Sequence, residues 1–206
     1  ILTWNQKPIN TVYHATNGGV MASVDEAWST NKVPYLQMRL DGPKQWTSKV
    51  DLPLSNEKYL KSFLVSKSEA FGSDHPLFRW ERTLDSSQVS TQLNKAQKVS
   101  SSFYPNKIKV LTRGSSGRVT SLKIYGKTGS EILLKLDDIR RVLRQLPSTL
   151  FVVKEIKEGK WLFSGGGFGH GVGMSQSGAI ELAKNGWTTK QILSHYYPKT
   201  KYGFLP

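Results

Sequence analysis

A glycine-rich segment near the C-terminal end of the chain holds the side chains best suited to chemistry. Residues 165–178 read GGGFGHGVGMSQSG, and half of these 14 residues are glycine. His170 lies between two glycines, so its ring lacks the apolar neighbours of a packed core histidine, and glycine lets a bulky substrate approach the backbone closely. We therefore expect Gly169 and His170 to face a substrate. The alternative is a tight structural crossing that holds a hydrogen-bonded histidine.

Ser175 and Gln176 close this segment, at the start of a helix predicted over residues 175–185. A serine side chain commonly accepts a hydrogen bond from the first free N–H groups of a helix. These two residues are therefore interpreted as helix caps, as hydrogen-bonding partners of a substrate, or as both.

A second polar segment lies near the start of the chain, where a predicted strand ends before an Asn-Gly-Gly turn. The residues of interest there are His14, Asn17, Gly18 and Gly19. The local residues leave His14 open between a ligand-facing role and a structural one. Asp25 and Glu26 follow, and with His14 they form a conceivable metal set. Their spacing matches no standard metal-binding motif, so no metal site is predicted.

The chain is strongly basic. Its 206 residues include 29 Lys and Arg against 15 Asp and Glu, a formal net charge of +14. This charge predicts an anionic partner, namely nucleic acid, an anionic membrane or an acidic polymer such as cell wall, although solubility alone also explains it. Arg113 and Arg118 flank a predicted turn, and we expect them to meet an anionic substrate. Arg140, Arg141 and Arg144 share a predicted helix and are interpreted as a solvated face.

The chain contains no cysteine. This excludes a disulfide scaffold, a cysteine-ligated zinc site, an iron–sulfur cluster and a thiol nucleophile. We predict no cofactor, and because no recognised nucleic-acid-binding motif is present, no nucleic-acid partner. No apolar run approaches the ~20 residues that a membrane-spanning helix needs. The first residues do not read as a signal peptide, so a signal or anchor is expected upstream.

Runs of strands with a few helices must position these residues. They predict an α+β fold, with mixed or antiparallel sheets and several helices that form a substrate groove. Helices are predicted over residues 56–66, 86–96, 137–146, 175–185 and 188–197. Strands are predicted over residues 1–4, 9–15, 33–40, 77–82, 108–112, 118–125, 131–136, 149–156 and 160–164. Residues 41–55 are interpreted as a loop.

Several motifs, in order along almost the whole chain, resemble the stage II sporulation protein D family (SpoIID/LytB). The first is YHATNGG at residues 13–19, followed by SVDEAW at 23–28 and VPYL at 33–36. The next are RGSSGRVTSL at 113–122 and LPSTLF at 146–151. The most specific is GFGHGVGMSQSGA at 167–179, which continues to YYP at 196–198.

The resemblance implies a bacterial cell-envelope protein, in the periplasm or cell wall, that acts on peptidoglycan glycan strands. Characterised members include lytic transglycosylases, which cleave MurNAc–GlcNAc linkages of denuded glycan to 1,6-anhydroMurNAc ends. Others are described as amidase enhancers, so a non-catalytic cell-wall binding module is the alternative. An amidase or another cell-wall hydrolase is then an expected partner. On this resemblance His14, Asn17, Gly18, Gly19, His170, Ser175 and Gln176 line a glycan groove.

The resemblance also implies that the catalytic acid lies elsewhere. A transglycosylase needs one carboxylic acid, which protonates the glycosidic oxygen and then takes the proton of the muramic C6 hydroxyl. The family's glutamate lies in a helix upstream of the segment that resembles residues 1–15, and no residue here matches it. Glu26 and Glu81 are the remaining possible acids, but no motif supports either. Some relatives carry a Cys/His zinc set, which this cysteine-free chain lacks.

The opening of the chain leads to the same expectation. It begins directly in a strand-like run, whereas natural domains seldom begin inside a hairpin. We therefore expect residues 1–206 to be one SpoIID/LytB-like domain that is incomplete at its N-terminus, with an upstream fragment of the same protein as a possible partner. Residues 52–105 are interpreted as a possible inserted or peripheral subregion. Trp28, Tyr35 and Trp80 are candidates for stacking on sugar faces, or for the core.

Overall fold

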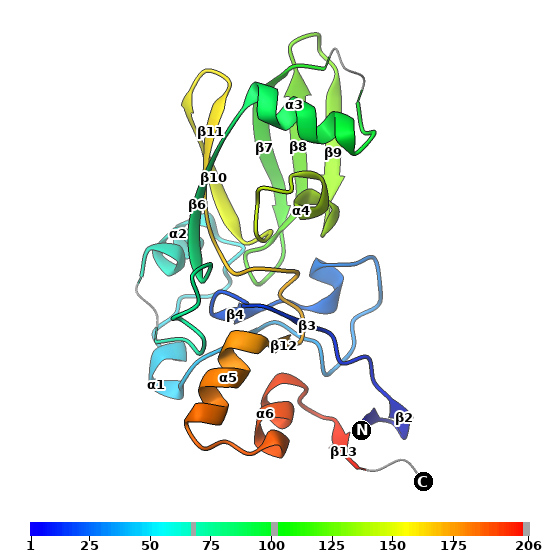
Figure 1. The fold of residues 1–206 in the computed structure, drawn as a ribbon, viewed down its shortest axis with the longest axis vertical. Coiled ribbons are helices and arrows are strands. Elements are labelled where there is room, and N and C mark those ends of the chain that lie inside the picture. Colours follow the sequence, from blue (N-terminus) through cyan, green and yellow to red (C-terminus); the bar gives the residue numbers. More distant parts are fainter. Residues whose placement is uncertain (67–68, 100–102, 204–206) are drawn as a thin grey trace.

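The computed structural model describes residues 1–66, 69–99 and 103–203. The molecule is elongated, with two large three-stranded sheets in its upper half and shorter strands with helices in its lower half (Figure 1). Both large sheets are antiparallel, which confirms the predicted α+β fold. In the described part of the chain, no helix has the length and apolar character needed to cross a membrane.

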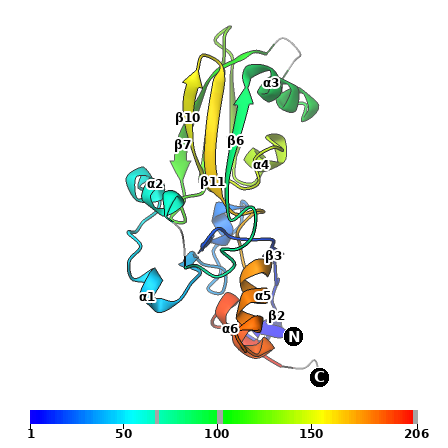
Figure 2. The same cartoon turned by 60° about the vertical axis from the view of Figure 1, so that its left-hand side comes forward.

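The first large sheet has the order β10-β11-β6. It comprises β6 (Arg79–Asp85), β10 (Phe151–Lys157) and β11 (Lys160–Gly166), which lie side by side in Figure 2. Trp161 and Phe163 are two residues apart on β11, so both point to the same face of the sheet, where they are buried.

The second large sheet has the order β7-β8-β9. It comprises β7 (Pro105–Arg113), β8 (Val119–Gly126) and β9 (Glu131–Lys135). Helix α3 (Ser86–Lys95) crosses in front of this sheet in Figure 1, and its N-cap is Asp85. Asp85 accepts a hydrogen bond from the N–H of Gln88, while the Gln88 side chain accepts one from the N–H of Asp85, which forms a capping box.

Helix α4 (Asp138–Val142) is shorter than the helix predicted over residues 137–146. The chain turns after Val142, and Leu143 and Leu146 enter the core from that turn. The apolar residues at helical spacing are buried as predicted, but the helix itself ends four residues earlier than predicted.

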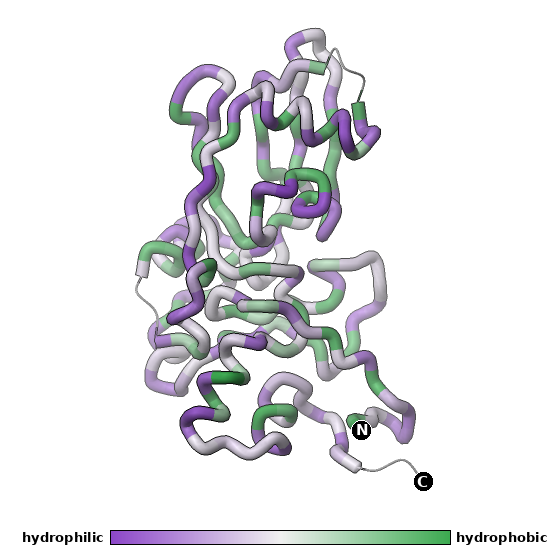
Figure 3. Tube along the Cα trace, in the orientation of Figure 1, coloured by the Kyte–Doolittle hydropathy of each residue, from purple (hydrophilic) through white to green (hydrophobic). Residues whose placement is uncertain are grey.

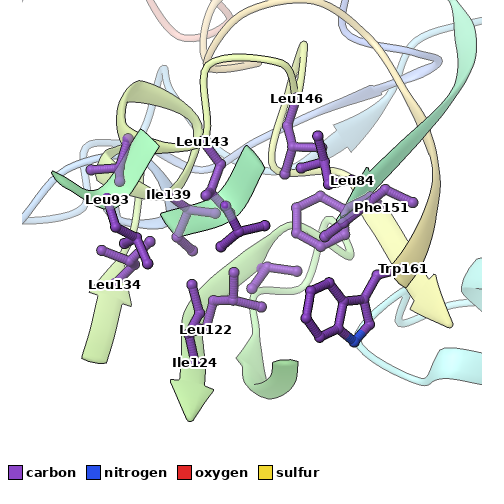
Figure 4. Packing of buried hydrophobic residues seen from close by; sticks show 14 of the residues in the cluster. Leu84, Leu93, Leu122, Ile124, Leu134, Ile139, Leu143, Leu146, Phe151 and Trp161 are labelled. Carbon is purple, nitrogen blue, oxygen red and sulfur yellow. The ribbon is translucent and has the colours of Figure 1, made fainter. Parts of the chain in front are cut away.

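Apolar side chains from both large sheets, α3 and α4 meet in one core (Figure 4). The hydrophobic segments of these strands alternate with hydrophilic ones in Figure 3, as expected for strands with one buried face. The labelled members of this core are Leu84, Leu93, Leu122, Ile124, Leu134, Ile139, Leu143, Leu146, Phe151 and Trp161.

The lower half is built from short strands and helices. The sheet β13-β1-β2 joins Lys201–Tyr202, Leu2–Trp4 and Lys7–Pro8, so that β13 lies beside the first strand of the chain (Figure 1). Strands β4 (Val20–Met21) and β5 (Arg39–Leu40) form one pair, and β3 (Tyr13–His14) and β12 (Met174–Ser175) another. The helical elements are η1 (Val24–Glu26), α1 (Lys44–Thr47), α2 (Glu57–Val65), α5 (Gln176–Lys184) and α6 (Thr189–Tyr196).

Two predictions for this half were wrong in part. The strand predicted over residues 33–40 forms only at Arg39–Leu40, because the N–H of Leu36 donates to the carbonyl of Val33 in a turn. The loop predicted over residues 41–55 contains α1, whose N-cap is Pro43. Tertiary packing decides both, since Leu36 and Trp46 are buried.

Residues 52–105 take part in two of the cores. Helix α2 contributes Leu60, Phe63 and Leu64 to a cluster that also contains Trp46 and Leu150. Strand β6 pairs with β11 along its whole length. The described residues of this segment therefore share sheets and cores with the rest of the fold.

Candidate functional site

The two segments that the sequence singled out lie side by side. Strands β3 and β12 pair in parallel, with Ser175 opposite His14. Just beyond them, Thr16 and Phe168 exchange backbone hydrogen bonds, with N···O distances of 3.3 and 2.7 Å. The glycine-rich connection between β11 and β12 therefore crosses the residues that follow β3, which places both candidate segments in one site.

Glycine is required where the two segments cross. Gly18 has φ +70°, and a Cβ built there would lie 2.7 Å from the backbone nitrogen of Gly167. Gly167 has φ +84°, and its Cβ would lie 2.9 Å from the carbonyl carbon of Asn17. These contacts are with backbone atoms, which cannot rotate away, so these glycines serve the crossing itself.

We call residues 13–19 and 165–175, where these two segments pass over each other, the crossing. The crossing holds two histidines against each other. The rings of His14 and His170 meet edge to face, with centroids 5.3 Å apart. Nδ1 of His14 lies 3.1 Å from the carbonyl of Val172, and Nε2 of His170 lies 3.0 Å from the carbonyl of Tyr13. Because a carbonyl only accepts, both ring nitrogens carry a proton. The N–H of Val172 donates to Nδ1 of His170 at 3.1 Å, so that nitrogen is unprotonated.

Both histidines are neutral at neutral pH. Burial lowers the pKa of His14 well below its usual value, and the nearby His170 and Arg118 lower it further. Burial also lowers the pKa of His170 to about 4. Nε2 of His14 is buried and has no hydrogen-bond partner among the described residues. Neither ring is therefore suited to donate a proton as a general acid at pH 7.

One aromatic side chain packs against His170, and two others are exposed on residues whose backbones lie nearby. Trp28 is half-buried, and its ring centroid lies 4.8 Å from that of His170. Phe168 and Tyr13, whose backbones border the same crossing, have 43% and 59% of their surface exposed. Trp80 instead is buried and donates from Nε1 to the carbonyl of Gly167 at 2.9 Å, so it belongs to the core. Tyr35 is half-buried against Trp4.

Arg113 and Arg118 lie inside the protein, whereas the sequence led us to expect them at an anionic substrate. Arg118 is fully buried and donates to the carbonyls of Asn17 at 3.1 Å and Val20 at 3.3 Å. Arg113 donates to the carbonyls of Gly117 and Phe151. Burial lowers the pKa of each guanidinium to about 10, so both remain charged at neutral pH.

A buried carboxylate that no sequence pattern indicated holds Asn17. Oδ2 of Asp41 accepts hydrogen bonds from Nδ2 of Asn17 at 2.6 Å and from the Tyr196 hydroxyl at 3.1 Å. Oδ1 of Asp41 lies 2.7 Å from Nε2 of His195. Asn17 in turn accepts from the N–H of Gly19 at 2.8 Å. Asn17 is therefore a fixed part of the crossing, and no local pattern links Asp41 to a helix at the other end of the chain.

The remaining candidates divide between capping and surface positions. Ser175 is fully buried and caps α5 by accepting from the N–H of Gly178 at 3.3 Å, while Gln176 is exposed. Gly169 has φ +110°, donates from its N–H to the carbonyl of Pro147 at 3.0 Å, and is half-buried. Ser175 is therefore a helix cap, as one of the interpretations had it. The exposed side chain of Gln176 stays a candidate for binding a ligand.

Three carboxylates bear on the question of a catalytic acid. Glu26 is buried and accepts from the hydroxyl of Ser115 at 2.9 Å and the N–H of Ser116 at 3.2 Å. Glu81 is exposed on β6 and accepts from the Ser164 hydroxyl.

Asp137 is the third carboxylate. Its negative charge raises the pKa of His170, but burial lowers that pKa by more. Burial opposes the ionisation of Asp137, but hydrogen bonds from Arg140 and Arg141 outweigh burial and lower its pKa. Asp137 therefore stays ionised at neutral pH. Within residues 1–66, 69–99 and 103–203, no group of three or more His, Asp or Glu side chains is arranged to hold a metal ion.

Comparison with known proteins assigns the family. Residues 22–173 match the family described as "Domain of unknown function (DUF8618)". The match covers more than half of the chain, so the chain belongs to this family. It includes the glycine-rich connection as far as Gly173, whereas His14 and the Asn-Gly-Gly turn lie before its first residue.

Individual relatives extend the similarity to nearly the whole chain. The chain is 29% identical to the amidase enhancer of Bacillus subtilis (strain 168), over 97% of its own length and 30% of the relative. It is 31% identical to stage II sporulation protein D of the same organism, over 98% of its own length and 47% of the relative. The homologue of that protein from Bacillus amyloliquefaciens is 29% identical over 96% of the chain.

These similarities confirm the resemblance to the SpoIID/LytB family that the sequence motifs indicated. The chain spans less than half of the length of each of these relatives, 30% of one and 46% and 47% of the other two.

Proposed function

We propose that this chain binds peptidoglycan glycan strands at the surface around His170, as part of a protein that processes them in the bacterial envelope. One observation carries the proposal. A neutral, half-buried His170 lies on a glycine-rich connection against the ring of Trp28, and its Nε2–H donates to the backbone of Tyr13, whose side chain is exposed. Aromatic faces next to a few fixed polar groups suit a ligand that has both apolar faces and hydroxyls, as sugars have. Similarity to an amidase enhancer and to stage II sporulation protein D supports an envelope role.

The reaction that we propose is lytic transglycosylation. The MurNAc–GlcNAc linkage of a denuded strand is cleaved when an acid protonates the glycosidic oxygen, and the C6 hydroxyl of MurNAc then closes the 1,6-anhydro ring. In this proposal the residues of the crossing bind and orient the strand. The proton comes from another group, because His170 has a pKa of about 4 and Asp137 is held ionised by Arg140 and Arg141.

The second candidate function is a non-catalytic cell-wall binding module that enhances an amidase. The favouring observation is that the carboxylates around the crossing already serve structural partners, and Asp41 binds Asn17 and Tyr196. Glu26 binds the turn at Ser115 and Ser116, and Asp137 binds two arginines.

Incubation of the protein with denuded glycan strands tests both candidates. Co-sedimentation measures binding, and mass spectrometry of the soluble fraction detects 1,6-anhydroMurNAc ends. Binding with anhydro products supports the transglycosylase. Binding without products, together with faster release of stem peptides by an added amidase, supports the enhancer. Absence of binding to glycan strands overturns the proposed function.

A further inference from the structure

A second feature of the surface is a cavity of about 660 Å³ whose lining is rich in arginine. This volume lies within the range of about 300–1,000 Å³ that is typical of ligand sites. Arg82 comes from β6, Arg140 and Arg141 come from α4, and Arg144 follows α4. The sequence indicated a solvated face for the last three. The fold instead sets them around a hollow with Arg82, which is far away along the chain.

The charge of this cavity is poorly balanced. Asp137 accepts from Arg140 at 2.8 and 3.0 Å and from Arg141 at 2.9 Å. Arg82 donates to the backbone carbonyl of Glu81, and this uncharged group does not neutralise the guanidinium. Among the described residues, Arg144 has no hydrogen bond or ion pair. Within the part of the chain that the structure describes, Asp137 is the only carboxylate that pairs with any of these four guanidiniums. The four arginines and Asp137 together carry an excess of three positive charges, which an anionic ligand would offset.

The cavity adjoins the proposed glycan surface. Phe168 and Pro147 belong to its lining, and Pro147 accepts the backbone hydrogen bond of Gly169, the residue before His170. Burial is the main cause of the low pKa of His170, and the positive charge of Arg140 lowers this pKa further. A chain-like ligand that contacts His170 can thus extend over Phe168 into the cavity.

We propose that this cavity binds carboxylate groups of the peptidoglycan strand, with Arg82 and Arg144 as the unpaired guanidiniums that receive them. The inference rests on the proposed function, because it assumes that a strand lies across His170. Guanidinium and carboxylate match in shape and form paired hydrogen bonds, which a neutral sugar does not offer. A strand has two sources of carboxylate: the lactyl group of a peptide-free muramic residue, and the acidic groups of a stem peptide.

The test compares the R82Q/R144Q double variant with the unaltered protein. Both side chains are exposed and neither pairs with Asp137, so the variant keeps the ion pairs that hold α4. The control is K157Q/K160Q, which removes the same charge from the exposed hairpin of β10 and β11. The ligands are denuded strands and strands that retain stem peptides, each used both with free carboxylates and with carboxylates converted to methylamides.

We expect R82Q/R144Q to bind carboxylate-bearing strands at least about tenfold more weakly at low salt, while the control stays within about twofold. We expect methylamidation to weaken binding by the unaltered protein and to have little effect on the variant. A loss on denuded strands identifies the lactyl group, and a loss confined to peptide-bearing strands identifies the stem peptide. Equal binding of native and methylamidated strands by the unaltered protein overturns the cavity proposal and leaves the proposed function standing. Absence of binding to every strand overturns the proposed function instead.

Discussion

His14 and His170 each hydrogen-bond to the segment that carries the other. His14 donates to the carbonyl of Val172, two residues after His170, and His170 donates to the carbonyl of Tyr13, the residue before His14. Their rings meet edge to face between these two bonds. The pair therefore fastens the glycine-rich connection to β3, and it also places His170 at the surface where we propose that a glycan binds.

The first prediction concerns this double role. His170→Ala removes two hydrogen bonds to backbone groups, and we expect it to lower the free energy of unfolding by about 1–3 kcal/mol and to weaken strand binding. Urea denaturation and co-sedimentation measure the two effects. Phe168→Ala is the matched variant, since its exposed ring makes it a test of binding at little cost in stability. Full binding by both variants would contradict the proposed surface.

The second prediction concerns pH. The pKa of His170 is lowered from 6.5 to about 4, and that of His14 is also lowered. The unfolded chain therefore binds more protons than the folded protein below about pH 6.5, so stability falls as the pH falls from about 6.5 towards 4. Each histidine contributes a slope of up to about 1.4 kcal/mol per pH unit.

Urea denaturation at pH 7, 6 and 5 measures this slope. The H14Q/H170Q double variant provides the comparison, because glutamine does not titrate. We expect its unfolding free energy to vary less with pH over this range. If the unfolding free energy of both proteins changed equally with pH, the pKa values of these histidines would not be lowered in the folded protein, and the prediction would be wrong.

The third prediction separates a buried arginine from an exposed one. Arg118→Ala leaves the carbonyls of Asn17 and Val20 without their donor and empties a fully buried volume, so we expect a loss of at least about 3 kcal/mol. Arg144→Ala removes the same type of side chain from the surface, and we expect a change within about 0.5 kcal/mol. Thermal and urea unfolding compare the two. Similar losses for both would mean that Arg118 does not hold the crossing.

The fourth prediction concerns the close approach of Gly18 and Gly167. Gly18→Ala would put a Cβ 2.7 Å from a backbone nitrogen, in a residue with φ +70°, so we expect a loss of more than about 3 kcal/mol or a failure to fold. Gly129→Ala is the control, because Gly129 has φ +79° but nothing within 4 Å of the added atom. Its expected cost is the backbone strain alone, about 1–2 kcal/mol. Expression yield and melting temperature report the difference.

Local patterns predicted most of the regular elements. Helices were expected over residues 56–66, 175–185 and 188–197, and the structure has α2, α5 and α6 there. Helix periodicity and capping depend on residues within one or two turns, so they can be read along the chain. The ordered motifs likewise indicate the family, because their residues and spacing are properties of the chain alone. The short strands β3, β4 and β5 were less predictable, because two-residue strands depend on partners far away in the sequence.

The sequence by itself determined the α+β class, the family relationship and the two segments that meet at the crossing. Only the tertiary structure decided which charges are buried and which meet solvent. Arg118 and Arg144 are the same residue type in similarly basic stretches, yet one is fully buried under backbone carbonyls and the other lines an open cavity. The physical reason is that the cost of burying a charge depends on the donors, acceptors and charges that the whole fold brings around it. Those neighbours, like Asp41 beside His195, come from distant parts of the chain.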